Sequence, residues 1–130
     1  NARMSDEPEA IRALAVRFFD AIQHGDAAAI EAIYDPAVEI WHNTDRATVT
    51  REDNLKTLRG FIARAPERRY TDRRLVVFPG GFVQQHLLIA RQANGKVLEL
   101  PACIVCAVSG GRITRLDEYF DSAALAGWLS

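Results

Sequence analysis

The apolar residues of this chain change their spacing near Pro66, and no other feature of the sequence limits the possible folds as strongly. Up to that point most of them recur every three or four residues, which is the period of an amphipathic helix. Beyond it, apolar and β-branched runs alternate with short glycine-bearing segments, which is typical of strands joined by hairpins. The chain is therefore predicted to place helices in its first half and an antiparallel sheet in its second half.

Capping residues delimit the helices of the first half. Ser5 is expected to cap the first helix and Gly25 to end it, because glycine is common just past a helix C-terminus. Asp26 is expected to cap the second helix, and Thr50 with Asp53 forms a capping box at the start of the third. The predicted helices cover residues 7–24, 27–34 and 51–65.

Period-two patterns bounded by glycine, proline and asparagine predict the strands. A short strand precedes the third helix, four longer strands follow it, and a last helical turn ends the chain, at residues 37–43, 70–78, 82–92, 96–108, 112–120 and 123–129. A twisted sheet of this size curls, and amphipathic helices must cover its apolar face. The predicted fold class is α+β, a curved and mostly antiparallel sheet wrapped around the N-terminal helices, with an internal pocket.

Length and charge limit the domain count and the kinds of partner. The 130 residues fit one domain, assigned to residues 4–130, with residues 1–3 set aside as a possible cloning remnant. A formal net charge of −1 lacks the basic surplus of a nucleic-acid-binding protein, so no nucleic-acid partner is expected. The densest basic stretch, Arg68–Arg74, is interpreted as the charged edge of a strand.

Membrane insertion and disulfides are not expected either. No apolar run reaches the roughly 18–20 residues that cross a bilayer, and the N-terminus lacks a signal pattern, so a cytoplasmic protein is expected. Cys103 and Cys106 lie three residues apart on a predicted strand and so point to opposite faces. They are expected to be reduced core residues rather than a metal site or a disulfide.

Polar residues within two predicted strands mark a candidate site, because an unpaired buried polar group costs about 1–3 kcal/mol. In the last strand, Glu118 alternates with Leu116 and Phe120, so its carboxylate is predicted to point inward. In the first strand, Trp41 and Asn43 share a face, where Trp41 either walls the pocket or packs in the core. The face opposite Glu118 is interpreted as solvent-exposed and consists of Ile113, Arg115, Asp117, Tyr119 and Asp121.

The histidines of the predicted strands leave alternatives open. His42 is expected to be a partly exposed residue at the end of its strand. Residues 82–91 carry polar side chains on both faces, so alternation does not identify the inward face there. His86 is therefore either a core histidine satisfied by a neighbour or a pocket residue.

Three stretches together resemble the nuclear transport factor 2-like superfamily, which includes ketosteroid isomerases, limonene-epoxide hydrolases and SnoaL-like polyketide cyclases. They are residues 18–36 with Phe18-Phe19-Asp20 and Asp35-Pro36, the Trp41-His42-Asn43 strand, and residues 110–121 ending in Glu118-Tyr119-Phe120-Asp121. The resemblance implies a cystatin-like cone fold that encloses a pocket. It also implies a homodimer formed through the open face of the sheet.

The resemblance implies fold more strongly than activity. Limonene-epoxide hydrolases carry an aromatic-x-Asn on the first strand, which Trp41-x-Asn43 resembles, and an acid before Tyr-Phe-Asp, which Glu118 matches. Where those enzymes use Arg-x-Asp, this chain has Gln84-x-His86. The epoxide-opening activity is therefore not expected here, and the acid and oxyanion set of ketosteroid isomerases has no clear counterpart.

The remaining polar residues predict an acid–base site. His86 and Glu118 are the candidate catalytic pair, since burial and mutual attraction can leave one of them able to move a proton near neutral pH. The candidate substrate-binding residues are Trp41, Asn43, Gln84, Tyr34, Phe82, Leu116 and Phe120. The hypothesis is an enzyme without metal or cofactor that isomerises, cyclises, hydrates or hydrolyses a small, largely apolar molecule. The alternatives are a non-catalytic small-molecule-binding protein and a dimeric interaction module.

Overall fold

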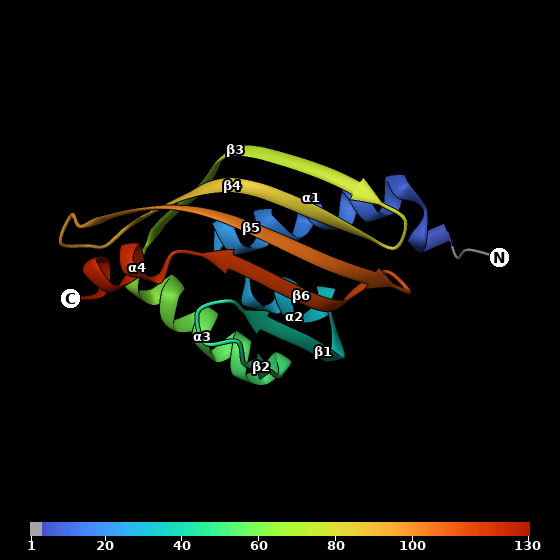
Figure 1. The fold of residues 1–130 in the computed structure, drawn as a ribbon, viewed down its shortest axis with the longest axis horizontal. Coiled ribbons are helices and arrows are strands. Elements are labelled where there is room, and N and C mark those ends of the chain that lie inside the picture. Colours follow the sequence, from blue (N-terminus) through green and yellow to red (C-terminus); the bar gives the residue numbers. More distant parts are fainter. Residues whose placement is uncertain (1–3) are drawn as a thin grey trace.

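The computed structural model describes residues 4–130, with only the backbone of Ser5, and shows one curved, six-stranded sheet with helices along its inner face (Figure 1). The expectations for residues 1–3 and for the Ser5 side chain lie outside the described residues. The helices are α1 (Pro8–His24), α2 (Ala27–Ile33), α3 (Arg51–Arg64) and α4 (Ser122–Leu129), after a short 3-10 turn at Met4–Asp6. The strands are β1 (Tyr34–His42), β2 (Thr48–Val49), β3 (Glu67–Phe78), β4 (Gly81–Arg91), β5 (Val97–Ser109) and β6 (Arg112–Phe120).

The sheet has the strand order β2-β1-β6-β5-β4-β3. The β3–β4, β4–β5 and β5–β6 pairs are antiparallel hairpins, whereas β1 pairs with β6 in parallel. This parallel pair brings the end of the early strand beside the end of the last one (Figure 1). The predicted α+β class with a mostly antiparallel curved sheet is confirmed.

Two of the predicted helix boundaries rest on the expected hydrogen bonds. Gly25 has φ 74° at the end of α1, and the Asp26 carboxylate accepts from the backbone N–H of Ala29 at 3.0 Å. Thr50 Oγ1 accepts from the Asp53 N–H at 3.2 Å at the start of α3. The helix α1 begins with Pro8 at its first position, which suits the fixed φ of proline, and its N-cap is Glu7 rather than Ser5.

A bulge in β6 corrects one predicted face. Ala107 pairs with Arg115 and Val108 pairs with Ile113, so Thr114 is the extra residue. The bulge shifts the alternation by one position, and Ile113 lies fully buried rather than on the solvent-exposed face. A period-two pattern cannot locate such an inserted residue.

The basic stretch lies in β3, an edge strand on which Arg69 and Arg74 are exposed as interpreted, but Arg68 is not part of this charged edge. Arg68 is buried, and its guanidinium donates to the carbonyl oxygens of Ile22 at 3.0 Å and Ala65 at 2.6 Å, with further bonds to Gln23 and Ile62. These carbonyls belong to the C-terminal ends of α1 and α3, which favour a cation. Burial lowers the pKa of Arg68.

Two apolar clusters pack on the inner face. The larger one joins α1 and α2 to the sheet through residues such as Phe18, Phe19 and Ile40, and the smaller one surrounds Trp128 of α4. Cys106 is buried in the larger cluster, whereas Cys103 is half-buried on the outer face, and both are free thiols. The predicted opposite orientation is confirmed, but the expectation that both cysteines are core residues is wrong for Cys103. Within residues 4–130, no helix is long and apolar enough to cross a membrane.

Candidate active site

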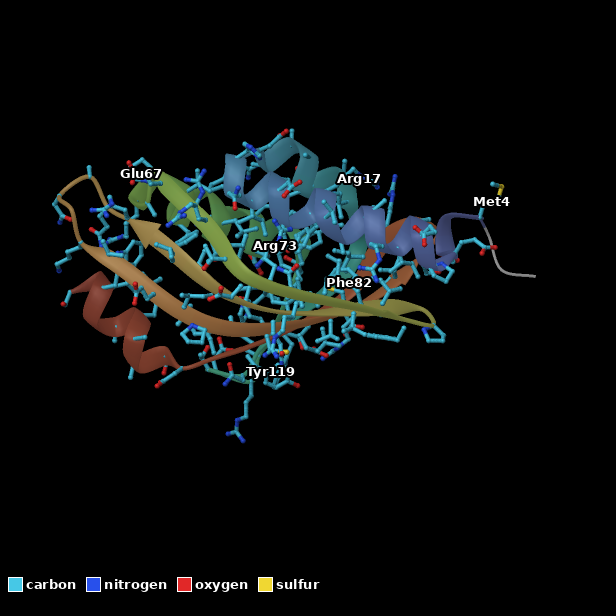
Figure 2. The ribbon with its side chains drawn as sticks, turned by 90° about the horizontal axis from the view of Figure 1, so that it is seen from above. Met4, Arg17, Glu67, Arg73, Phe82 and Tyr119 are labelled. Atoms are coloured by element: carbon cyan, nitrogen blue, oxygen red, sulfur yellow. The ribbon has the colours of Figure 1, made fainter. Side chains whose placement is uncertain are left out.

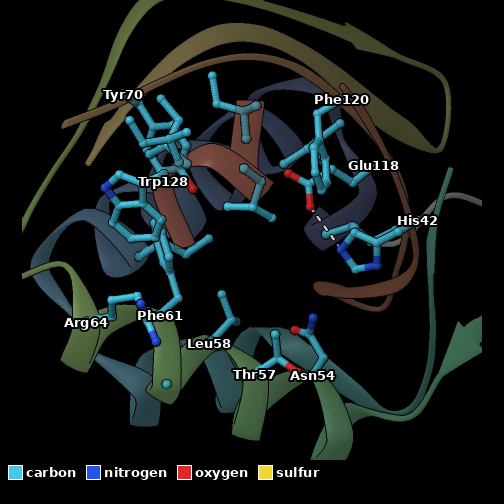
Figure 3. A pocket seen from close by; sticks show the side chains of 18 of the residues that line it. His42, Asn54, Thr57, Leu58, Phe61, Arg64, Tyr70, Glu118, Phe120 and Trp128 are labelled. Atoms are coloured by element: carbon cyan, nitrogen blue, oxygen red, sulfur yellow. Dashed lines mark ion pairs between the residues drawn. The ribbon is translucent and has the colours of Figure 1, made fainter. Parts of the chain in front are cut away.

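A cavity of about 440 Å³ lies between the inner face of the sheet, α3 and α4 (Figure 3). It is bordered by both apolar clusters, because α4 closes one end of the space that the sheet and α3 leave open. Most of its lining is aliphatic or aromatic. The polar or charged side chains in the wall are those of Tyr34, His42, Asn54, Thr57, Arg64, Tyr70 and Glu118.

His42 and Glu118 form an ion pair on the cavity wall. They are direct neighbours in the parallel β1–β6 register, and His42 Nε2 lies 3.0 Å from Glu118 Oε1. Their side chains are 25% and 22% exposed, so the pair is shielded but reachable from the cavity. Figure 3 shows one carboxylate oxygen of Glu118 directed at the imidazole and the other directed away from it, toward the open space.

The pKa of His42 is raised above its usual value. The hydrogen bond with Glu118 is the largest cause, and the charges of Glu118 and Asp45 add to it, while burial works in the opposite direction. The imidazolium form is therefore favoured beside the carboxylate. The pair can hold or release a proton at the edge of an apolar space.

Tyr34 and Asn54 form a second polar pair in the cavity wall. The Tyr34 hydroxyl donates to Asn54 Oδ1 at 2.9 Å, and both side chains are buried. Burial is the main cause that raises the pKa of Tyr34, so this phenol stays neutral and acts as a donor. Because Asn54 Oδ1 is occupied, its amide NH₂ is the group left to donate, and Figure 3 shows it directed at the cavity.

The opposite side of the cavity is apolar and closes against α4. The Phe61 and Trp128 rings lie 5.9 Å apart, and the Trp128 indole donates to the Lys96 carbonyl at 3.3 Å, which fixes the end of α4 on the β4–β5 hairpin. The exposed members of the lining mark the entrance, which runs between the edge of α3 and the end of α4. They are Thr57, Gly60, Arg64 and Leu129.

Four of the residues predicted for the site do line this cavity: Tyr34, Leu116, Glu118 and Phe120. Phe82 is instead fully buried in the core, where its ring lies 6.1 Å from that of Phe19 (Figure 2 shows Phe82 beneath α1). The inward position of the Glu118 strand face was thus correctly predicted for residues 116–120.

Trp41 and Asn43 do not take the predicted positions. In β1 the inward residues are Val38, Ile40 and His42, so Trp41 lies on the outer face, with its ring 5.3 Å from that of Tyr119. The Asn43 amide binds the backbone of Phe120, accepting from its N–H at 3.0 Å and donating to its carbonyl at 3.1 Å. Asn43 thus fixes β1 to β6, and its neighbour His42 enters the cavity in its place.

Gln84 and His86 face inward but are used in the core. Gln84 Nε2 lies 3.0 Å from His86 Nδ1, and the His86 ring packs against Tyr70 at 4.5 Å and Phe19 at 5.5 Å. Burial lowers the pKa of His86 to about 4, so the imidazole is neutral at ordinary pH. The ion-pair partner of Glu118 is His42, which corrects the predicted pairing of Glu118 with His86.

The sequence analysis missed five polar residues of the wall, His42, Asn54, Thr57, Arg64 and Tyr70, and the first two had a clear signal in the sequence. His42 follows Val38 and Ile40 at period two, which indicates the inward face of β1. Asn54 lies four residues before Leu58 and seven before Phe61, which is the helical spacing of a shared face. In residues 4–130, no group of three or more His, Cys, Asp or Glu side chains is arranged to hold a metal ion.

The geometry is suited to moving a proton on an apolar molecule. Glu118 has one carboxylate oxygen free to accept a proton, while the His42 imidazole holds the other. The Asn54 NH₂ group can donate to an oxygen that gains negative charge when the proton leaves. The low polarity of the remaining wall strengthens both interactions.

Comparison with known proteins identifies relatives of the same architecture. The profile of the SnoaL-like domain family matches residues 15–116. No curated protein sequence matches the chain significantly. A candidate polyketide cyclase from Xanthomonas campestris pv. campestris superposes with a TM-score of 0.81 at 18% identity, covering 95% of this chain and 98% of that one.

Further solved structures carry other activities in their names. AclR, a candidate hydroxylase from Streptomyces galilaeus, has a TM-score of 0.82 at 12% identity, covering 92% of this chain and 80% of that one. An LEH-like epoxide hydrolase of M. tuberculosis has a TM-score of 0.75 at 20% identity, covering 93% and 89%. At these identities the likeness shows the fold alone.

Proposed function

Since this chain belongs to the SnoaL-like domain family, we propose that it is an enzyme that transfers a proton on a small, largely apolar molecule, with Glu118 as the proton acceptor. The relatives with this fold include proteins named for cyclase, hydrolase and ketosteroid isomerase activities, which supports an enzyme over an interaction module. Fold alone does not select among them, so the proposal depends on the site.

The observation that carries the proposal is the ion pair of His42 and Glu118, 3.0 Å apart on the wall of an apolar cavity. A charged pair in such a place is costly to desolvate, so it needs a compensating role. The same ion pair on the outer face of the sheet would stabilise the ends of β1 and β6 equally well, without the cost of desolvation.

The roles follow from the contacts. Glu118 takes a proton from an acidic C–H or O–H group of the substrate, and the bonding electron pair stays on the substrate as an enolate or alkoxide. Asn54 donates a hydrogen bond to the resulting oxyanion, and Tyr34 keeps the Asn54 amide in that orientation. His42 acts as a positioning residue that holds one oxygen of Glu118. Return of the proton to another atom of the enolate gives isomerisation. In a cyclisation, the enolate carbon attacks a carbonyl carbon of the same molecule, the carbonyl π bond breaks, and the resulting alkoxide takes the proton back from Glu118.

A generic carbon acid tests the proposal without knowledge of the natural substrate. Nitrobenzisoxazole opens when a base removes its C–H proton, the N–O bond breaks, and a coloured phenolate is released. We expect Glu118→Gln to lower kcat/KM for this probe by about 100-fold or more, which is the usual contribution of a general base. His42→Gln should cause a smaller loss and displace the pH profile of the rate.

The matched control is Glu99→Gln, which removes the same charge from the exposed outer side of β5 and should leave the rate unchanged. Thermal unfolding of all variants separates loss of function from loss of fold. A wild-type rate no greater than that of Glu118→Gln would overturn the proposal.

The second candidate is a non-catalytic binding protein, which the mostly apolar lining favours. Such a protein needs no ionisable group to move a proton. Binding of the probe without turnover, and with an affinity that does not change between pH 5 and pH 8, would select this alternative.

A further inference from the structure

The polar groups of the cavity lie at its two ends, and α3 connects them. Asn54, Leu58, Phe61 and Arg64 follow each other at spacings of three and four residues and all line the cavity. Asn54 and Arg64 are about 15 Å apart along the helix axis at ~1.5 Å rise per residue. Figure 3 shows Asn54 near His42 and Glu118, with Arg64 on the opposite side of the open space.

Arg64 is distinguished from the other arginines near the sheet by its place in the cavity lining. Among the described residues, Arg69, Arg74 and Arg112 also take part in no ion pair, but they lie outside the cavity. Arg68 donates to backbone carbonyls, Arg73 pairs with Asp20 at 3.2 Å, and Arg91 pairs with Glu67 at 3.2 Å. Among the described residues, none of the ion pairs of the chain includes Arg64. Its guanidinium is the only cation of the cavity lining besides the His42 imidazole, within the part of the chain that the structure describes.

The position of Arg64 suits recognition of an anion. It lies in the last turn of α3, at the entrance beside Gly60, where an added Cβ meets nothing within 4 Å, so a ligand group has room there. A guanidinium binds a carboxylate through two parallel hydrogen bonds and remains charged at any ordinary pH. Between Arg64 and the Asn54 end, the wall consists of apolar side chains such as Leu58, Phe61 and Trp128.

We propose that the ligand of this cavity is an amphipathic anion, with a carboxylate bound by Arg64 at the entrance and an apolar body that carries the reacting group to Glu118. The inference rests on the proposed function in taking this cavity as the substrate site, and it adds the class of substrate. An apolar molecule without the anion fills the same space but leaves Arg64 solvated, so it binds more weakly.

A pair of fluorescent probes with the same body separates the two contributions. Anilinonaphthalene sulfonate carries an anion, and N-phenylnaphthylamine is its neutral counterpart. We expect the wild-type protein to bind the anionic probe about 10-fold more tightly than Arg64→Gln does, whereas the neutral probe binds both proteins equally. The preference should weaken with rising salt, because Arg64 is exposed.

Arg59→Gln is the matched control, since it removes the same charge from the same helix, outside the cavity lining. Competition by decanoate against decanol, monitored with the neutral probe, tests the carboxylate directly, and decanoate should compete better only while Arg64 is present. Equal losses in Arg59→Gln and Arg64→Gln, or equal competition by acid and alcohol, would overturn the inference.

These measurements need no turnover, so they fail or succeed independently of the proposed function. If Glu118→Gln keeps the probe preference and loses activity, both proposals stand. If the preference is present and wild-type turnover is absent, the anion site stands and the enzyme proposal fails. If turnover depends on Glu118 and the preference is absent, the substrate class proposed here is wrong.

Discussion

His42 and His86 both lie on the inner face of the sheet, yet their surroundings move their pKa values in opposite directions. The hydrogen bond with Glu118 raises the pKa of His42, whereas burial between Tyr70 and Phe19 lowers the pKa of His86 to about 4. An unfolded histidine has a pKa of about 6.5. The two residues therefore affect stability with opposite signs as the pH changes.

We predict acid destabilisation caused by His86. Between pH 6.5 and about 4 the unfolded state binds a proton at this residue that the folded state does not, so stability falls as the pH drops through this range. The expected loss is roughly 1–3 kcal/mol. His42 contributes stability that is fully present below about pH 6.5 and is lost as the pH rises through its raised folded pKa.

Urea unfolding at a series of pH values measures how the free energy of unfolding changes with pH. His86→Gln should reduce the loss of stability at acidic pH while keeping a hydrogen-bond partner for Gln84. His42→Gln should reduce the loss of stability at alkaline pH. The imidazole signals in NMR spectra give the two pKa values directly. A His86 signal that titrates above pH 6.5 would contradict the buried, neutral state.

The Trp41-x-Asn43 motif shows why residue roles were harder to predict than residue positions. Its resemblance to the aromatic-x-Asn of limonene-epoxide hydrolases predicts that Trp41 and Asn43 line the pocket. Val38 and Ile40 are buried, however, so the odd-numbered side chains of β1 point outward. A single step along a strand moves a side chain to the other face. The same step directs His42 toward Glu118, and His42 is partly exposed at the end of β1 as expected.

At the scale of helices and strands, the elements with explicit local signals were predicted well. Glycine-bearing hairpins and capping residues act through neighbouring backbone groups, so the sequence displays them directly. The bulges of β3 and β6 depend on pairing with another strand, so no local sequence pattern indicates them. Asp72, with φ 53°, belongs to such a bulge and turns Arg73 toward Asp20.

The junction of α1, α3 and β3 leads to a stability prediction at this scale. An added Cβ at Gly25 would lie 2.7 Å from Arg68 Nη2, which binds the carbonyl of Gln23 at 3.1 Å. Gly25 also has φ 74°, which disfavours any other residue. We expect Gly25→Ala to destabilise the protein by about 2–3 kcal/mol, of which about 1 kcal/mol is backbone strain.

Gly95→Ala provides the control, since Gly95 has φ 90° but open space around its Cβ position. It should cost only the strain, about 1 kcal/mol. Denaturant unfolding of the two variants compares these costs. Equal destabilisation would show that Arg68 does not hold the helix ends as described.

At the scale of the whole molecule, the outer face of the sheet remains to be explained. Val105 and its register partner Val83 are only half-buried there, as are Leu87 and Ile89 farther along β4, and Tyr119 is 44% exposed. A strand spacing of ~4.8 Å and a rise of ~3.3 Å per residue give the β1–β3 face an area of roughly 700 Å². That is close to the ~800 Å² that each partner buries in a stable interface.

The charges on this face indicate how a second copy would dock. Exposed Arg69 and Arg74 lie on β3 at one edge, and exposed Glu39 lies on β1 near the other. A two-fold axis parallel to the central strands places β3 of one copy over β1 of the other, which brings opposite charges together. The same argument gives the expected homodimer a defined orientation.

We predict a homodimer that Val105→Arg converts to a monomer, because a long charged side chain at the centre of the interface would hold the two sheets apart and would have to be desolvated. Light scattering coupled to gel filtration gives the mass of each species. Val16→Arg, on the helix side of the molecule where Val16 is 41% exposed, introduces the same charge and should leave the dimer intact. Because the cavity lies on the inner face, the Val105→Arg monomer should also keep its affinity for the neutral naphthylamine probe. A wild-type monomer, or a dimer that survives Val105→Arg, would place the contact elsewhere and leave the apolar outer face without this explanation.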